Sequence, residues 1–269
     1  MKKVLSILGA VILVFYTAIC LLLYLNQEQI IFLPTKLSPD HSFQFDQPFE
    51  EKTIRTKDGT TLNTVLFKAD SSKGVIFYLH GNAGSIDSWG WVATTYTSLH
   101  YDVFMLDYRG YGKSGGKIQN EQQLYDDIQT AYNELKKLYD ENNIVVLGYS
   151  IGTGLASKVA SQNHPKLLIL QAPYYSLIDE MHTRFPVIPT FILKYKFETH
   201  KHLKACKMPV VIFHGDQDYV INFSASQRLQ KEFKPGDQLI RLPGEGHNGM
   251  TDSPNYQLML EKILLANEM

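Results

Sequence analysis

The chain has 269 residues, enough for one α/β domain with a sizeable core and an additional segment. Its 26 basic and 27 acidic residues nearly cancel, and no basic stripe is present, which argues against nucleic acid as a partner. The two cysteines, Cys20 and Cys206, lie far apart and form no C-x-x-C pair, which excludes a disulfide framework and a cysteine-based metal site.

Residues 4–25 form an uncharged apolar run near the N-terminus. As a helix this run extends about 33 Å, long enough to cross the hydrocarbon core of a bilayer. A cleaved signal peptide is the alternative, but its apolar region would be shorter and would end in small residues. We therefore expect a single-pass membrane anchor over residues 1–28. Lys2 and Lys3 precede the run and Lys36 is the first basic residue after it, so the positive-inside rule predicts an extracytoplasmic main domain.

A Phe- and Pro-rich linker is expected over residues 29–50, and the main domain over residues 51–269. Residues 51–55 and 60–68 predict a β-hairpin. Further along, continuous apolar runs predict buried strands, and helical patterns lie between them. This alternation implies a mostly parallel sheet with helices on both faces. The expected strands are 75–79, 103–106, 144–147, 167–170, 210–213 and 238–242, and the clearest helices are 121–138, 224–232 and 255–265.

The strand expected at 144–147 leads into Gly148-Tyr149-Ser150-Ile151-Gly152, and residues 155–160 favour a helix. This is the G-x-S-x-G pattern, in which a serine lies on a strained turn between a strand and a helix. The glycines two residues before and after the serine pack too closely for a Cβ. A chance match in an ordinary turn is the alternative, but the flanking strand and helix favour this strained strand-to-helix turn, which is called the nucleophile elbow. We therefore expect Ser150 to be a nucleophile.

A serine hydroxyl needs a general base at neutral pH, and nine histidines compete for that role. His247 lies in a glycine-rich loop after the last strand, at the edge of the sheet where ligands bind. His80 and His214 adjoin glycines at strand ends and are expected to brace turns. His200 and His202 suggest a metal site, but no carboxylate or cysteine cluster accompanies them. We expect His247 to be the base, and no metal.

The acid that orients the base is expected after the strand at 210–213. Two carboxylates follow it, Asp216 and Asp218. Asp218 lies further beyond the strand, where it can turn back towards His247, whereas Asp216 is expected to cap the turn. The sequence therefore favours Asp218.

A glycine-rich turn, His80-Gly81-Asn82-Ala83-Gly84, follows the first buried strand. Backbone N–H groups from such a turn and from the residue after the nucleophile form an oxyanion hole. We assign these donors to Asn82 or Ala83 and to Ile151, and an ordinary βα turn is the alternative. Gly112-Lys113-Ser114 resembles the end of a phosphate-binding loop, but the glycine required earlier is Asp107, which excludes that motif. Arg109 in this segment is expected to form a local salt bridge.

With these residues placed, the chain resembles serine hydrolases of the α/β-hydrolase superfamily, in particular the membrane-anchored alpha/beta-hydrolase-domain proteins. The resemblance covers residue 29 to the C-terminus, and the order Ser, Asp, His is that of the superfamily. It implies cleavage of a carboxylic ester or thioester through an acyl-enzyme, without a cofactor. A serine peptidase and a non-catalytic binding module are the alternatives. The shared motifs are 80–84, 107–114, 148–152, 214–218 and 246–248.

Residues 173–208 form an insertion that is expected to be a small lid. It is too short for a large cap domain, so we expect a shallow, open acyl site. Its aromatic and apolar residues either line the pocket or pack the lid onto the sheet. Because the domain is anchored beside a bilayer, the expected substrate is a small-molecule or lipid-like acyl ester. The sequence indicates no oligomeric state.

Overall fold

A computed structural model describes residues 1–267, so residues 268 and 269 of the expected main domain lie outside the described part. An eight-stranded sheet with the order β10-β9-β8-β7-β4-β6-β3-β2 forms its centre. β3 runs antiparallel to both of its neighbours, and the other neighbouring pairs are parallel, which confirms the predicted mostly parallel sheet. The strands are β2 (Phe49–Arg55), β3 (Thr61–Phe67), β4 (Gly74–Leu79), β6 (Tyr101–Leu106), β7 (Ile144–Tyr149), β8 (Leu167–Gln171), β9 (Val210–Gly215) and β10 (Gln238–Leu242).

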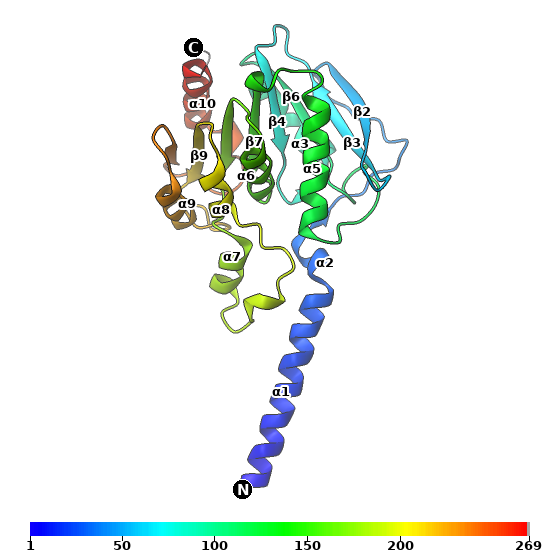
Figure 1. The fold of residues 1–269 in the computed structure, drawn as a ribbon, viewed down its shortest axis with the longest axis vertical. Helices are drawn as coiled ribbons and strands as arrows, with labels where there is room; N and C mark the ends of the chain where they lie inside the picture. Colours follow the sequence, from blue (N-terminus) through cyan, green and yellow to red (C-terminus); the bar gives the residue numbers. More distant parts are fainter. Residues whose placement is uncertain (268–269) are drawn as a thin grey trace.

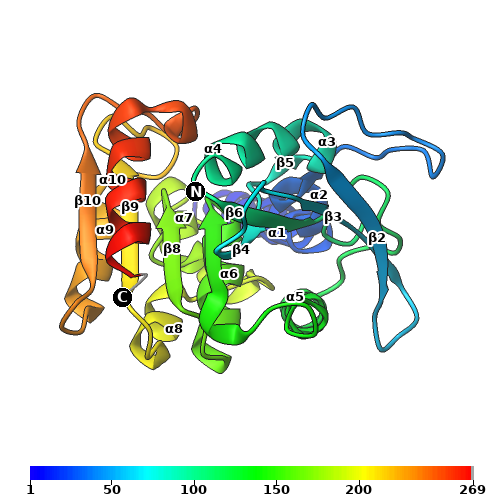
Figure 2. The same cartoon turned by 90° about the horizontal axis from the view of Figure 1, so that it is seen from above.

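Helices cover both faces of the sheet (Figure 2). Each face has its own cluster of buried apolar side chains, so the sheet is buried between two helical layers. One layer consists of α5 (Glu121–Leu135), α6 (Gly152–Gln162), α8 (Thr199–Ala205) and α9 (Ser224–Leu229); the other consists of α3 (Ile86–Trp89), α4 (Ala93–Thr97) and α10 (Pro254–Ala266). Short 3₁₀ turns are η1 (Gly90–Val92), η2 (Glu141–Asn143), η4 (Gln230–Glu232) and η5 (Met250–Asp252).

Side-chain caps set where the long helices begin. The Asn120 side chain accepts a hydrogen bond from the N–H of Gln123 at 2.9 Å, which satisfies an N–H of the first turn of α5. Ser253 does the same for α10, where Pro254 occupies the first helical position. α5 ends at Leu135, three residues before the predicted end at residue 138.

The N-terminal helix α1 (Lys2–Leu25) projects away from the sheet, and the two chain ends lie at opposite ends of the molecule (Figure 1). None of its 24 residues is buried. Its length of about 36 Å and its apolar composition are sufficient to cross a membrane.

The segment that follows α1 is packed along the domain. It forms α2 (Gln27–Ile31) and then β1 (Leu33–Pro34), which pairs in parallel with β5 (Ala83–Gly84). Further on, Phe43 is buried in the core. The pairing of β1 with β5 attaches the base of α1 to the loop that follows β4.

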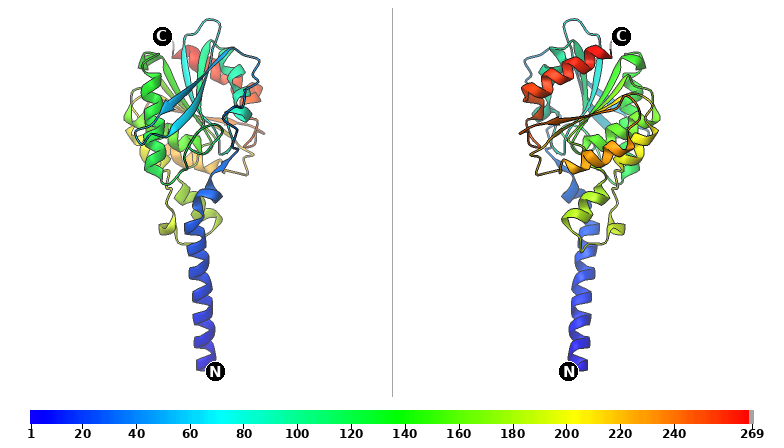
Figure 3. Two further views of the ribbon diagram at one scale, coloured as in Figure 1. Left: turned by 90° about the vertical axis from the view of Figure 1, so that its right-hand side faces the viewer. Right: turned by 90° about the vertical axis from the view of Figure 1, so that its left-hand side faces the viewer.

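The insertion at residues 173–208 contains α7 (Leu177–Arg184), η3 (Thr190–Ile192) and α8. α7 and η3 lie beside α2 and the last turns of α1, as the views in Figures 1 and 3 show. The lid segment and the N-terminal helix therefore meet at the same end of the sheet domain.

Candidate active site

Ser150 follows β7 directly and has a φ of +52°. A left-handed φ is strained for a residue other than glycine, and such strain is concentrated at functional sites. The two flanking glycines are required by close packing. A Cβ on Gly148 would lie 2.5 Å from the carbonyl oxygen of Gly152, and one on Gly152 would lie 2.1 Å from that of Leu79. The backbone at residues 148–152 thus has the geometry expected for the elbow.

Three side chains predicted from the sequence meet at one edge of the sheet. β7, β9 and β10 are parallel, so the loops that follow them emerge on the same side. The Oγ of Ser150 lies 3.0 Å from Nε2 of His247, and Nδ1 of His247 lies 2.7 Å from Oδ2 of Asp218. This arrangement can transfer a proton from the hydroxyl to the imidazole and stabilise the cation formed.

Asp216, the other candidate carboxylate, is placed elsewhere. Its Oδ1 accepts a hydrogen bond from the N–H of Gly244 at 2.8 Å, and its Oδ2 lies 2.7 Å from Nη2 of Arg241. Asp216 therefore joins the loop after β9 to the loop after β10.

The Asp218 carboxylate is buried but keeps its charge. Burial alone would raise its pKa. Hydrogen bonds from His214 and His247, the charge of His247 and the N–H of Ile221 outweigh that effect and hold the pKa of Asp218 well below its usual range. A carboxylate that stays ionised can stabilise a protonated imidazole.

His214 is a site residue whose role was incomplete in the sequence interpretation. Its Nε2 lies 2.9 Å from the carbonyl oxygen of Ile221, so it does brace the turn as predicted. The same nitrogen lies 3.2 Å from Oδ2 of Asp218, and Nδ1 lies 2.6 Å from Oγ of Ser226. A histidine at a strand end, four residues before the predicted acid, was the available signal for this second contact.

Two buried tyrosines hold the backbone around the serine and the histidine, and the motifs gave no indication of them. The hydroxyl of Tyr149 donates to the carbonyl oxygen of His247. The hydroxyl of Tyr174 donates to the carbonyl oxygen of Ile151 at 3.1 Å. These two hydrogen bonds hold the backbone of His247 and the backbone of Ile151, the residue after Ser150.

The candidate oxyanion donors come from the residue after Ser150 and from the turn after β4. Ile151 caps the N-terminus of α6, where the first N–H groups have no acceptor within the helix. Asn82 lines the same cavity as Ser150 and Ile151. Ala83 is exposed and pairs with Leu33 in the short β1–β5 ladder. This geometry favours Asn82 over Ala83 as the loop donor.

A cavity of about 610 Å³ extends from Ser150 beneath the lid, and its lining is mainly apolar. Side chains of α1 and α2 supply part of its wall, which the sequence did not indicate. Among the lid aromatics, Tyr174 and Phe185 line the cavity. Phe191 is 87% exposed, and Tyr175 stacks on His200 with ring centroids 4.2 Å apart.

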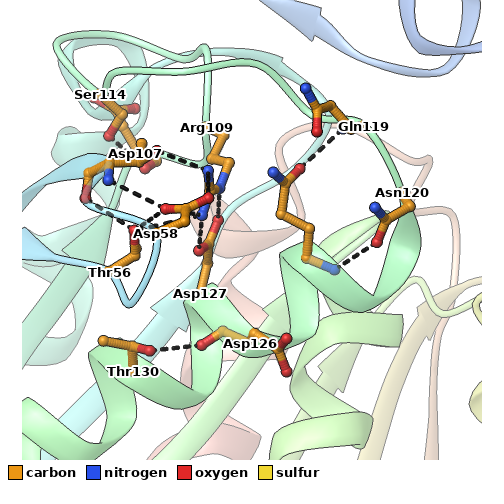
Figure 4. Close-up of polar contacts among 12 residues, drawn as sticks. Thr56, Asp58, Asp107, Arg109, Ser114, Gln119, Asn120, Asp126, Asp127 and Thr130 are labelled. Carbon is orange, nitrogen blue, oxygen red and sulfur yellow. Dashed lines mark hydrogen bonds and ion pairs between the residues drawn. The ribbon is translucent and has the colours of Figure 1, made fainter.

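The segment that resembled a phosphate-binding loop is held by an ion-pair network (Figure 4). The buried guanidinium of Arg109 places Nη2 2.7 Å from Oδ1 of Asp127 and Nη1 2.7 Å from Oδ2 of Asp58. Arg109 thus links the loop after β6 to α5 and to the β2–β3 turn, which is the local salt bridging that the sequence predicted.

A mostly parallel sheet with a serine at a strand-to-helix elbow and the partner loops at the same edge defines the α/β-hydrolase fold. The sequence model of the family described as "Serine aminopeptidase, S33" matches residues 70–197. The protein bem46 of Schizosaccharomyces pombe is 31% identical over 190 residues, which are 66% of this chain and 63% of bem46.

A protein of Acanthamoeba polyphaga mimivirus, whose name describes it as an alpha/beta hydrolase, is 32% identical over 197 residues. The match covers 70% of this chain and 72% of the viral protein. An esterase structure from Pyrococcus furiosus has the same fold, with a TM-score of 0.71 and 18% identity over 89% of this chain and 98% of the esterase. The chain therefore belongs to the α/β-hydrolase family.

Proposed function

We propose that this hydrolase cleaves carboxylic esters or thioesters, with Ser150 as nucleophile, His247 as base and Asp218 as the orienting acid. The observation that carries the proposal is the continuous contact from Ser150 through His247 to Asp218, with distances of 3.0 and 2.7 Å. Hydrogen-bonded contacts of this length are those that general base catalysis requires. The strained φ of Ser150 adds independent support.

In the proposed reaction His247 takes the hydroxyl proton of Ser150 as Oγ attacks the acyl carbonyl. Asp218 stabilises the imidazolium, and the N–H groups of Ile151 and Asn82 donate to the oxyanion. His247 then gives its proton to the leaving alcohol or thiol. Water, deprotonated by His247, releases the acid from the acyl-enzyme. Each oxyanion donor accelerates such a reaction by about 10²–10³. These steps require no cofactor.

The cavity supports an acyl group as the part of the substrate that is recognised. Its lining is dominated by apolar side chains, and its charged lining residues Glu180 and Arg184 pair with each other at 3.3 Å. An uncharged hydrocarbon chain fits such a lining better than a peptide with a free amine does. We therefore propose a small-molecule or lipid-like acyl ester as the substrate.

Hydrolysis of soluble 4-nitrophenyl esters tests the proposal. Wild-type protein in detergent should cleave them, and Ser150→Ala should reduce the rate by at least about 10³. Ser161→Ala is the matched control, because Ser161 lies near the C-terminal end of α6, the helix that follows Ser150. There its hydroxyl donates to the carbonyl oxygen of Lys158 at 2.7 Å. Equal rates in Ser150→Ala and Ser161→Ala would contradict the proposal.

A serine peptidase is the second candidate, because the matching family model carries an aminopeptidase description. The same three side chains could support amide cleavage. Matched ester and amide substrates with one acyl group separate the two functions. A peptidase should cleave the amide as well as the more reactive ester, whereas the esterase or thioesterase we propose should cleave the ester and leave the amide intact. A binding module without catalysis should cleave neither.

We also propose that α1 anchors the protein with the catalytic domain on the extracytoplasmic side. Lys2 and Lys3 at the start of α1 support this orientation, because basic residues favour the cytoplasmic flank. Protease added to intact cells should digest the domain. Protection of the domain until the cells are lysed would indicate the opposite orientation.

A further inference from the structure

The membrane anchor forms part of the wall of the cavity that contains Ser150. Ile19 and Leu23 line it from the last turns of α1, and Ile30 and Ile31 line it from α2. The opposite wall is the lid, which includes Phe185. The cavity is therefore completed by the anchor, and it joins the nucleophile to a surface of the anchor helix.

The buried side-chain amide of Gln27 joins the base of the anchor to the lid. The side chain of Gln27 is 5% exposed. Its Nε2 donates to the carbonyl oxygen of Ile192 at 2.7 Å, and its Oε1 accepts from the N–H of Lys194 at 2.8 Å. Both backbone groups belong to the lid, so one side chain fixes the lid against the base of the anchor.

Further polar contacts join the anchor and the lid beside Gln27. Nζ of Lys194 lies 3.2 Å from Oε1 of Glu28, and the hydroxyl of Tyr195 donates to the same oxygen at 2.9 Å. The Lys194 ammonium also lies 4.7 Å from the centroid of the Tyr24 ring. Tyrosines and lysines of this kind are typical of the level at which a membrane helix leaves the hydrocarbon.

The register of α1 places the cavity opening at hydrocarbon depth. A bilayer core of about 30 Å corresponds to about 20 helical residues, so a span that begins at Lys3 reaches the level of Leu23. Lower on the helix, the hydroxyl of Tyr16 donates to the carbonyl oxygen of Val187 at 2.7 Å. Ile19, Leu23 and the tip of the lid therefore lie in the leaflet next to the catalytic domain.

The lid tip has the composition that this depth requires. Residues 185–193 carry no charge. Phe185, Val187 and Phe191 are 57%, 74% and 87% exposed in the isolated chain. Large apolar side chains gathered on one surface mark a site of contact with a partner or a membrane. The lid tip adjoins a candidate membrane span, so the partner indicated is hydrocarbon.

We propose that this cavity is a binding site for a long acyl chain, built jointly by the anchor and the lid, and that the chain enters it laterally from the adjacent leaflet. The inference rests on the proposed function, because the ester or thioester carbonyl of the same molecule must reach Ser150. The anchor then contributes directly to substrate selection in addition to holding the protein at the membrane.

Chain-length selectivity in vesicles tests the inference. The full chain is reconstituted into phosphatidylcholine vesicles, and kcat/KM is measured for 4-nitrophenyl butyrate and 4-nitrophenyl palmitate. Leu23→Trp fills the cavity from the anchor side. Leu22→Trp is the matched control, because Leu22 is 61% exposed and does not line the cavity.

Leu23→Trp should lower the palmitate-to-butyrate ratio of kcat/KM by about tenfold or more, since each methylene excluded from an apolar site removes about a fourfold factor. Leu22→Trp should leave the ratio at the wild-type value. Equal ratios in both variants would overturn the inference. Failure of the proposed function is a separate outcome: butyrate hydrolysis would then be absent or insensitive to Ser150→Ala.

Two membrane-resident sources of the acyl chain are distinguished in the same vesicles, a palmitoyl glycerol ester and an S-palmitoyl peptide. Hydrolysis of either one, with the same sensitivity to Leu23→Trp, supports the inference and identifies the source. Hydrolysis of neither would overturn it.

The depth of the lid tip is measured separately. Phe191→Trp should give fluorescence that brominated acyl chains quench above the level of the parent chain. Leu138→Trp, on an exposed residue between α5 and η2, should show no such increase. Equal quenching of the two variants would contradict seating of the lid tip in the bilayer.

Discussion

Nε2 of His214 lies 3.2 Å from Oδ2 of Asp218, the same oxygen that Nδ1 of His247 approaches at 2.7 Å. One carboxylate oxygen is therefore held between two imidazole rings. The hydroxyl of Ser226 lies 2.6 Å from Nδ1 of His214, and when it donates there, Nε2–H remains the donor to the carboxylate. His214 thus acts as a positioning residue that keeps Asp218 facing His247.

Removal of this contact should slow the reaction without removing the nucleophile. His214→Ala should lower kcat by about tenfold with KM little changed, because a hydrogen bond to a charged group is lost. His214→Gln retains an N–H donor of similar reach and should recover part of the rate. Steady-state kinetics with one soluble ester measures both variants. A loss of thermal stability with unchanged kcat would show that His214 is only structural.

The buried pair of Asp107 and His80 should give opposing contributions to stability. Oδ1 of Asp107 lies 3.8 Å from Nε2 of His80. Burial raises the pKa of Asp107 to about 7, although hydrogen bonds from the N–H groups of Ile86 and Lys113 oppose the rise. Burial lowers the pKa of His80 to about 4, although a hydrogen bond with Gly81 opposes the fall.

For each residue, the change of the free energy of unfolding with pH depends on whether the folded or the unfolded state holds the proton. Between about pH 4 and 7 the folded state keeps a proton on Asp107 that the unfolded state has released, so this residue makes the free energy of unfolding fall as pH rises. Over about pH 4 to 6.5 the unfolded state holds a proton on His80 that the folded state lacks, so this residue makes the free energy of unfolding rise as pH rises.

Asp107→Asn should therefore gain stability relative to wild type as pH rises from about 4 to 7. His80→Gln should lose stability relative to wild type as pH rises from about 4 to 6.5. Denaturant unfolding in detergent across this range measures both trends. Differences from wild type that do not change with pH would contradict the assigned protonation states.

The elbow should not tolerate a methyl group at Gly152. A Cβ there would lie 2.1 Å from the carbonyl oxygen of Leu79 in β4, and the backbone of a central strand cannot move aside. We expect Gly152→Ala to lower the free energy of unfolding by about 3 kcal/mol. Gly246→Ala is the control, because the nearest atom to its Cβ would be 3.8 Å away. Similar stability of the two variants would rule out the close packing described.

We expect the ion pair with Arg109 to stabilise the carboxylate of Asp127 in the core. Asp127 is 2% exposed and burial raises its pKa, although Arg109 opposes the rise through hydrogen bonds and charge. Arg109→Met should destabilise the fold by about 3–5 kcal/mol, because it leaves a buried carboxylate unpaired. The double variant Arg109→Met/Asp127→Leu should recover most of this loss. Unfolding in guanidinium compares them, and equal losses in the single and double variants would argue against the ion pair.

The sequence predicted the sheet and the residues that meet at its edge because both depend on local patterns. Ser150, Asp218 and His247 each lie a few residues beyond an apolar run. In a mostly parallel sheet the corresponding strand ends share one edge. The meeting of these three side chains therefore followed from strand order, although their catalytic roles stay predictions.

The contacts of the anchor were not predictable in this way. Gln27 and Ile192 are separated by 165 positions, and no periodicity or motif links them. The cavity wall contributed by α1 was not predicted for this reason, since it appears only after folding. The second contact of His214 was missed because a histidine beside a strand-end glycine suits a turn equally well.

The assignment of the nucleophile is tested most directly by locating the covalent adduct of a fluorophosphonate by mass spectrometry of the full chain. We expect a single adduct on the peptide that contains Ser150. It should be absent in Ser150→Ala and strongly reduced in His247→Ala. An adduct on another residue, or labelling of Ser150→Ala at the wild-type level, would contradict the assignment of Ser150 as the nucleophile.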